Sequence, residues 1–334
     1  MGTKVGIVGF RGYSGAELVR LLERHPRTEV VLLEHREDPE IQPAPIGTKP
    51  HPRVPATPEA IKEAGLSVVF LATPADVSME LASAIMPIGV PIIDLSGAFR
   101  FQDAGVYSRW YKETHTAPAL LRHAVYGLPE FCRDRIRSAR LIANPGCYPT
   151  AANLAIQPLI AANVVDRTAG IVCDAKSGVS GAGRKPSLKT SFCEVSENLS
   201  AYAVLDHRHV PEILKISGIE ERELSFTAQL LPIHRGILET IYFRAQGIRS
   251  EDELLAIYAR RYENEPFIRL YSGSFPDIRG VEHTNFCDIG VRLDAGSGRA
   301  VIVSVIDNLV KGAAGQAVQN MNLILGFPET EALL

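Results

Sequence analysis

The first 22 residues contain the pattern that most restricts how this chain can fold. Residues 4–10 form a short apolar run, glycines stand at positions 9, 12 and 15, and residues 16–22 have the apolar spacing of a helix. A strand, a glycine turn and a helix in this order are typical of a dinucleotide-binding fold, because glycines let the backbone approach a pyrophosphate at the helix N-terminus. The spacing is GxxGxxG rather than GxGxxG, so an ordinary tight strand-to-helix turn is the alternative.

The end of the second apolar run bears on which dinucleotide would bind. Residues 29–33 read as a strand, and Glu34 and Arg36 follow it near the position where such folds contact the adenosine ribose. Glu34 would favour NAD if its carboxylate faced the ribose, whereas Arg36 could hold the 2′-phosphate of NADP. A solvent-exposed strand end is the alternative for both side chains.

Apolar runs alternate with helix-like segments up to the middle of the chain. Residues 66–72 and 90–95 read as buried strands, the first of which ends at Thr73 and Pro74. This alternation predicts a mostly parallel sheet, in which ligands bind at the carboxyl ends of the strands. Residues 101–137 show no clear period and are expected to be an excursion. We therefore expect an α/β, doubly wound dinucleotide-binding domain over residues 1–146.

The pattern changes after residue 146. Five longer strand-like runs follow with few helices between them, at residues 169–175, 226–231, 237–243, 287–293 and 300–306. They predict an α+β domain over residues 147–308 with a mixed or largely antiparallel sheet. Too few helices follow to cover both faces of that sheet, so we expect a homo-oligomer built through this domain. A small-residue helix from Leu309 is expected to return residues 309–334 to the first domain.

Cys147 is the candidate nucleophile. It stands in residues 144–150, between a strand-like run and a helix-like run, and Pro149 suits the first turn of that helix. A helix N-terminus favours thiolate over thiol, and such sites lower a thiol pKa from about 8.5 to roughly 3.5–7.5. A buried structural cysteine is the alternative.

A cysteine nucleophile needs a proton donor or acceptor, and residues 207–213 are the densest polar candidate. His207 and His209 precede a helix that is expected to begin near Pro211. We choose His209, because it lies nearer to the helix and because residues two apart in an extended loop point in opposite directions. His234 and Arg235 form a second polar cluster, which could equally be a turn at a strand end.

Composition narrows the partners to small molecules. The chain has 334 residues, which suits two domains, and its net charge of −3 comes from interspersed charges of both signs. It therefore lacks the basic surface expected for nucleic acid or membrane binding. Five cysteines, with no CxxC pair and no cluster at zinc spacing, indicate reduced thiols and no metal site. With no recognisable signal peptide or transmembrane run, we expect a cytoplasmic protein.

The two main features together predict a reaction class. A dinucleotide fold implies hydride transfer, and an activated cysteine implies a covalent acyl-enzyme. Their combination predicts the interconversion of an aldehyde and an activated acyl group.

Seven motifs follow one another along essentially the whole chain. They are GFRGYSGAEL at residues 9–18, DLSGAFR at 94–100, YGLPE at 126–130, NPGCYPT at 144–150, SGVSGAGR at 177–184, HRHVPEI at 207–213 and PIHRG at 232–236. In this order they resemble the N-acetyl-gamma-glutamyl-phosphate reductase family, the arginine-biosynthesis branch of the aspartate-semialdehyde dehydrogenase-like group.

The resemblance implies an NADPH-dependent enzyme that reduces an acyl phosphate through a thioester on Cys147, with His209 as acid/base, and that forms a homodimer or homotetramer. The implied cofactor-binding residues are Gly9, Gly12, Tyr13, Ser14, Gly15, Arg36, Thr73, Pro74, Ser177 and Gly178. The implied substrate-binding residues are Arg100, Asn144, Arg208, Glu212, His234 and Arg235. Glu34 departs from the pattern, since NADP users prefer small or basic residues there.

Two alternatives stay open at this point. One is the related aminoadipyl-phosphate reductase of lysine biosynthesis, whose substrate is longer by one methylene, a difference worth only about 1–3 kcal/mol. The other is a non-catalytic NADP-binding regulator, in which Cys147 and His209 would have no task.

Overall fold

The computed structural model describes residues 2–35, 50–185 and 187–334. These form two compact units. The first comprises Met1–Tyr107, Glu113–Asn144 and Ala317–Leu334, and the second comprises Ser108–Lys112 and Pro145–Gln316.

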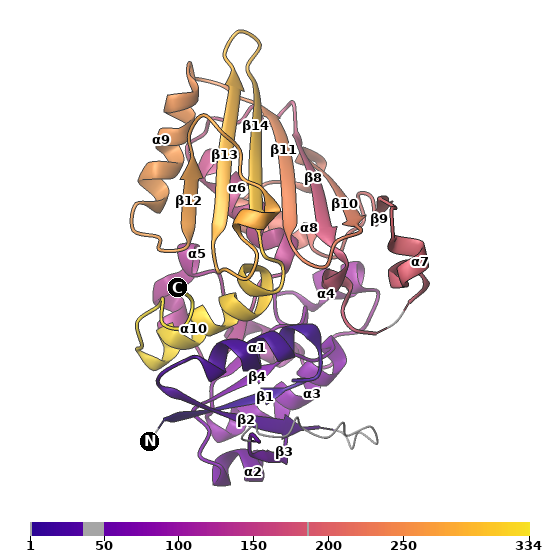
Figure 1. The fold of residues 1–334 in the computed structure, drawn as a ribbon, viewed down its shortest axis with the longest axis vertical. Helices are drawn as coiled ribbons and strands as arrows, with labels where there is room; N and C mark the ends of the chain where they lie inside the picture. Colours follow the sequence, from indigo (N-terminus) through magenta and orange to yellow (C-terminus); the bar gives the residue numbers. More distant parts are fainter. Residues whose placement is uncertain (1, 36–49, 186) are drawn as a thin grey trace. The chain divides into compact units, whose positions relative to one another are not determined.

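The first unit contains a parallel sheet. Over the described residues it has seven strands in the order β3-β2-β1-β4-β5-β7-β6, and all neighbours are parallel. Figure 1 labels four of them, β1 to β4. The strands are β1 (Thr3–Val8), β2 (Thr28–Glu34), β3 (Arg53–Pro55), β4 (Val68–Leu71), β5 (Ile92–Asp94), β6 (Ala124–Tyr126) and β7 (Leu141–Ala143). The strand order reverses direction between β1 and β4, which is the switch point where doubly wound sheets bind their ligands. The expected doubly wound domain is confirmed.

Helices of the first unit pack on this sheet. They are α1 (Tyr13–Glu23), α2 (Pro58–Glu63), α3 (Ala75–Ile85) and α5 (Pro129–Arg137). The greater part of α10 (Gly315–Leu325) also belongs to this unit, where Nδ2 of Asn320 donates to the carbonyl of Gly127, directly after β6. The central strands are apolar along their whole length because both faces are covered, as β4 shows with every residue fully buried.

The expected excursion contains regular structure. Residues 101–137 include α4 (Ala104–Tyr111), the 3₁₀ helix η2 (Pro118–His123), β6 and α5. The sequence period is hard to see because β6 is only three residues long and α5 is mostly charged, with Pro129, Glu130 and Ile136 as its buried residues.

The second unit contains a mixed sheet. In the described part of the chain its seven strands have the order β12-β13-β14-β11-β8-β10-β9. They are β8 (Ile171–Gly178), β9 (Ser200–Tyr202), β10 (Leu224–Leu231), β11 (Ile237–Arg244), β12 (Ile268–Tyr271), β13 (Cys287–Asp294) and β14 (Arg299–Ile306). The pairs β8–β10 and β12–β13 are parallel and the others antiparallel, so the expected α+β unit with a mixed sheet is confirmed.

One face of this sheet carries the helices. The long helix α6 (Cys147–Ala161) packs on β11 and β14, and it also contacts α8 (Val210–Ser217) and α9 (Glu251–Tyr262). The strands alternate accordingly: Ile241 of β11 is fully buried, whereas its neighbour Tyr242 is 45% exposed. Val172 of β8 is exposed to the same extent. The face opposite α6 is therefore partly apolar and accessible in the single chain.

The expected helix from Leu309 has two parts. Residues Val310–Ala314 form a π-helix, η7, in the second unit, and α10 follows it directly. Single π-turns of this kind are rare and frequently lie at functional sites. No helix in the described ranges is both long enough and apolar enough to cross a membrane.

Candidate active site

Cys147 is the first residue of α6. Gly146 is the N-cap, with an extended backbone and no capping side chain of its own. Asn144, Pro145 and Gly146 separate this helix from the end of β7, and Pro149 fits the first turn because no intrahelical hydrogen bond is needed there. The backbone N–H groups of Cys147 and Tyr148 belong to the helix start, where no intrahelical acceptor exists. They are suited to stabilise an oxyanion formed next to the sulfur.

A cavity of about 700 Å³ in the second unit opens beside Cys147. Its walls include the side chains of His207, Arg208 and His209. Other parts of the wall come from the turn after β8, the segment 187–190 and β9, and Trp110 and Lys112 also line the cavity. Ser177 and Gly178, which were expected to bind the cofactor, also line this cavity.

The two histidines lie together in this cavity, with ring centroids 4.8 Å apart. Both line the cavity, although residues two apart in an extended loop would point in opposite directions, because the segment is a turn and His209 has helical backbone angles as the N-cap of α8. The His209 backbone N–H donates to Nδ1 of His207 at 3.1 Å, which leaves the proton of a neutral His207 on Nε2.

Burial in an aromatic environment keeps His207 neutral. Its ring contacts those of Tyr148, Tyr202 and Phe226. Burial, helped by the positive charge of Arg208, lowers the pKa of His207 to about 4. His207 therefore serves as a neutral hydrogen-bonding group near pH 7, and His209 remains the better candidate for proton transfer.

A buried carboxylate fixes the residue before the nucleophile. Glu212 lies in the first turn of α8, is 1% exposed, and accepts the backbone N–H of Gly146 at 3.0 Å through Oε2. Glu212 does not line the cavity in the described residues. The structure thus places it behind the nucleophile, although it was expected to bind substrate.

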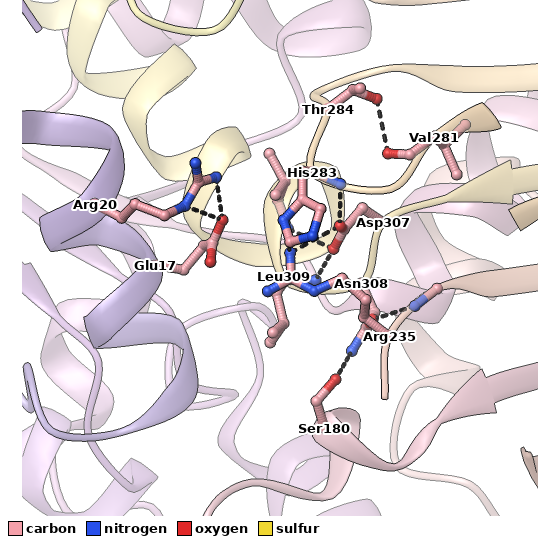
Figure 2. Close-up of polar contacts among 12 residues, drawn as sticks. Glu17, Arg20, Ser180, Arg235, Val281, His283, Thr284, Asp307, Asn308 and Leu309 are labelled. Carbon is pink, nitrogen blue, oxygen red and sulfur yellow. Dashed lines mark hydrogen bonds and ion pairs between the residues drawn. The ribbon is translucent and has the colours of Figure 1, made fainter. Parts of the chain in front are cut away.

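Asp307 and Asn308 connect the segments that contain Ser180, Arg235 and His283, as Figure 2 shows. Asp307 is fully buried and accepts hydrogen bonds from Nη1 of Arg235 at 3.0 Å and from the backbone N–H of His283 at 2.7 Å. Asn308 donates to Oγ of Ser180 at 3.0 Å. The sequence analysis missed this pair, although a polar Asp-Asn directly after the last strand-like run is a signal that could have indicated it.

Four other expected substrate residues occupy different places. Arg235 is buried and paired with Asp307, and His234 is exposed, so neither is among the residues that line the cavity. Arg100 lies in the first unit, where its Nε donates to the carbonyl of Asn144 at 2.9 Å. Asn144 is 1% exposed and accepts from Nδ2 of Asn320 at 3.1 Å. Of the expected set, Arg208 is the residue that the structure places in the wall.

The first unit has a separate cavity of about 450 Å³ at the switch point of its sheet. Gly9, Gly12, Thr73 and Pro74 line it. Gly9 has φ +79, and a β-carbon there would lie 2.2 Å from the carbonyl oxygen of Ala72. Helix α1 begins after Gly12 without a side-chain cap, so its N–H groups can bind a phosphate.

Gly15 keeps the turn between β1 and α1 compact. A β-carbon on Gly15 would lie 2.2 Å from the carbonyl oxygen of Gly9. Tyr13, Ser14 and Gly15 form the first turn of α1. The residues present therefore fit a dinucleotide pyrophosphate.

Glu34 also lines this cavity, and so does Arg11. Arg11 and Arg53 approach its carboxylate at 3.6 and 3.4 Å and lie over the ring of Phe10. Arg36, the residue expected to hold a 2′-phosphate, lies outside the described residues. In the described part of the chain, no group of three or more His, Cys, Asp or Glu side chains could hold a metal ion.

Comparison with known families assigns the class. A model of the semialdehyde dehydrogenase NAD binding domain matches residues 4–139, and one of the semialdehyde dehydrogenase dimerisation domain matches residues 147–308. The N-acetyl-gamma-glutamyl-phosphate reductase of Symbiobacterium thermophilum is 48% identical, over 100% of this chain and 98% of its own. That of Desulforudis audaxviator is 48% identical, over 99% and 98%. The chain belongs to the N-acetyl-gamma-glutamyl-phosphate reductase family.

Solved structures support the fold. Aspartate semialdehyde dehydrogenase II from Vibrio cholerae, complexed with ASA, is similar with a TM-score of 0.73 at 19% identity, covering 98% of this chain and 99% of the other. The aspartate semialdehyde dehydrogenase of Candida albicans with NADP gives 0.70 at 16% identity, with the same coverage. At these identities the likeness concerns the fold.

Proposed function

We propose that this protein reduces N-acetyl-gamma-glutamyl phosphate to the 5-semialdehyde and phosphate, the step of arginine biosynthesis after which its relatives are named. The observation that carries the proposal is the position of Cys147 at a helix start, in one cavity with two histidines and Arg208. The substrate is proposed from the names of relatives that match this chain over nearly its full length. Its five cysteines, widely spaced and without a CxxC pair, suit the reducing cytoplasm in which we place it.

The chain's own residues account for the acyl-transfer chemistry. Cys147 gives its proton to His209, and the sulfur attacks the acyl carbon. The carbon–oxygen bond to phosphate breaks, the phosphate takes the proton from His209, and a thioester remains on Cys147. The N–H groups at the start of α6 stabilise the oxyanion.

The second half of the reaction releases the aldehyde. A bound nicotinamide dinucleotide supplies the hydride that reduces the acyl carbon. The tetrahedral oxyanion on Cys147 then collapses, the carbon–sulfur bond breaks, and His209 returns a proton from solvent to the sulfur. The net reaction consumes one proton. Arg208, a guanidinium in the cavity wall, binds an anionic group of the substrate.

We propose NADPH as the dinucleotide. The pyrophosphate would rest on the turn of Gly9, Gly12 and Gly15, where close backbone contacts exclude side chains at Gly9 and Gly15. Arg11 lines the same cavity, and Arg11 and Arg53 both lie beside Glu34, so the two arginines would hold the 2′-phosphate together. Glu34 is then neutralised by the arginines rather than bound to the ribose.

We further propose that the protein is a homodimer or homotetramer formed through the second unit. That unit matches a dimerisation domain, and the sheet face opposite α6 exposes Val172 and Tyr242. Light scattering at micromolar concentration tests this, and a monomer mass would contradict it.

A single assay tests the proposed reaction. Formation of NADPH is followed from aldehyde, phosphate and NADP, comparing N-acetylglutamate semialdehyde with its homologue longer by one methylene and with aspartate semialdehyde. The highest kcat/KM is expected for the acetylglutamate compound, by about 10-fold or more over the homologue. A preference for the homologue would assign the aminoadipyl reaction instead. Equal or better use of NAD would show that Glu34 contacts the ribose.

A further inference from the structure

We propose that Glu212 is a positioning residue, which holds the nucleophile in place by binding the backbone immediately before it. The inference rests on Cys147 being the nucleophile, as proposed above. Its carboxylate accepts the Gly146 N–H at 3.0 Å, and the side chain is 1% exposed behind the cavity rather than in its wall. Glu212 therefore acts on the chemistry through Gly146 and not through the substrate.

The peptide units of Gly146 are fixed at both ends. Its N–H is bound by Glu212, and its carbonyl accepts both the backbone N–H of Thr150 at 3.0 Å and the Thr150 hydroxyl at 2.9 Å. Thr150 is fully buried. Because Cys147 follows Gly146 directly, these hydrogen bonds set where the helix begins and where its first side chain emerges.

Glu212 also links the nucleophile to the acid/base, through its side chain and its backbone. Glu212 lies in the first turn of the helix whose N-cap is His209, and its backbone N–H donates to the His209 carbonyl at 3.2 Å. A second buried link joins the two helices, since Oγ of Ser217 donates to Oδ1 of Asn153 at 2.8 Å. The N-terminus of α8 is thus tied to the N-terminus of α6 at the point where both supply a reacting side chain.

Two conservative substitutions separate the effect of side-chain length at Glu212 from the effect of its charge. Glu212→Gln keeps an acceptor oxygen at the same distance but removes the charge. Glu212→Asp keeps the charge but shortens the side chain by one methylene, so the oxygen no longer reaches Gly146. If Glu212 positions the nucleophile, its side chain must be long enough to accept the Gly146 N–H, and the charge is not needed. If Glu212 acts by its charge, on the site or on the substrate, the carboxylate itself is needed.

The main readout needs neither substrate nor cofactor. The rate constant for alkylation of Cys147 by iodoacetamide is measured from its peptide by mass spectrometry, which separates it from exposed Cys193. We expect the Asp variant to lose at least tenfold in alkylation rate and in kcat, with KM within threefold of the native value. The Gln variant should stay within threefold in all three. Thermal unfolding confirms that each variant is folded.

Several results would overturn the proposal. The proposal is excluded if the alkylation rate of Cys147 falls tenfold or more in the Gln variant. It is also excluded if that rate falls less than threefold in the Asp variant. A change in KM alone returns Glu212 to the substrate site. If the Asp variant does not fold, Glu212→Ala, which leaves no buried charge, takes its place with the same expectation. Alkylation decides the question even if the proposed substrate proves wrong.

Discussion

Gly312 lies so close to Cys147 that no other residue fits there without movement. A β-carbon on Gly312 would be 2.8 Å from the β-carbon of Cys147 and 3.2 Å from its α-carbon. Gly312 belongs to the π-helix η7, which is separated from the Asp307–Asn308 pair only by its N-cap, Leu309. The widened turn brings this backbone against the nucleophile, and glycine is required because the atoms it meets are close to the main chain.

Gly312→Ala should therefore impair both catalysis and stability. The new methyl group displaces Cys147, and a misplacement of about 1 Å costs on the order of 100-fold in rate. We expect kcat to fall by about 10–100-fold, and the overpacking to destabilise the protein by about 1–3 kcal/mol. Gly296→Ala is the matched control, because the nearest atom to a β-carbon there is 3.5 Å away. Native kcat in the Gly312 variant would contradict the account.

His209→Asn should lower kcat by about 10²–10⁴-fold, the usual contribution of a positioned acid/base. His207→Asn should have a smaller effect, because His207 is already neutral and accepts the backbone N–H of its neighbour. The measurement is a pH–rate profile of both variants. The reverse ranking would assign proton transfer to His207.

His207 also predicts how stability depends on pH. Its folded pKa of about 4 lies below the ordinary value of 6.5. As the pH falls from 6.5 to 4, the unfolded chain gains a proton that the folded protein does not, so stability is lost over that range. The loss amounts to at most about 3 kcal/mol at about 1.4 kcal/mol per pKa unit. His207→Asn should show a flatter dependence of Tm on pH, and parallel curves would refute this.

For Glu239 we expect the opposite dependence, a stability that falls as the pH rises. It is fully buried in β11, it accepts a hydrogen bond from the thiol of Cys173 at 3.4 Å, and burial raises its pKa well above the ordinary value. Above pH 4.5 the unfolded chain releases this proton while the folded protein keeps it, so stability falls as the pH rises. Glu239→Gln should gain Tm relative to the native protein between pH 5 and 8. A constant difference across that range would argue against a neutral Glu239.

The parts of the fold and site that could be predicted are those whose pattern lies within a short stretch of sequence. Gly9 and Gly15 stand between a strand and a helix, and Cys147 stands before a helix; both patterns are visible within a few residues. Helix α5 was missed because its buried residues are too few to give a period.

The rest of the site depends on contacts between distant segments. Glu212 and Gly146 are 66 residues apart, and Asp307 and Arg235 are 72 apart. Arg235 was expected to bind substrate because an arginine in a polar turn matches an anion, yet its partner is an aspartate in a different strand end. His207 and His209 both line the cavity because the chain turns there, and neither residue type requires such a turn.

The thioester on Cys147 is the central claim, and trapping it is the most direct test. The protein is incubated with N-acetyl-gamma-glutamyl phosphate without a dinucleotide, so that the reaction stops after the loss of phosphate. Mass spectrometry should then find one N-acetylglutamyl group per chain, on the peptide that contains Cys147. The Cys193→Ser variant should carry the same group, and the Cys147→Ala variant should carry none and have no turnover. An adduct elsewhere, or substantial activity in Cys147→Ala, would contradict the mechanism.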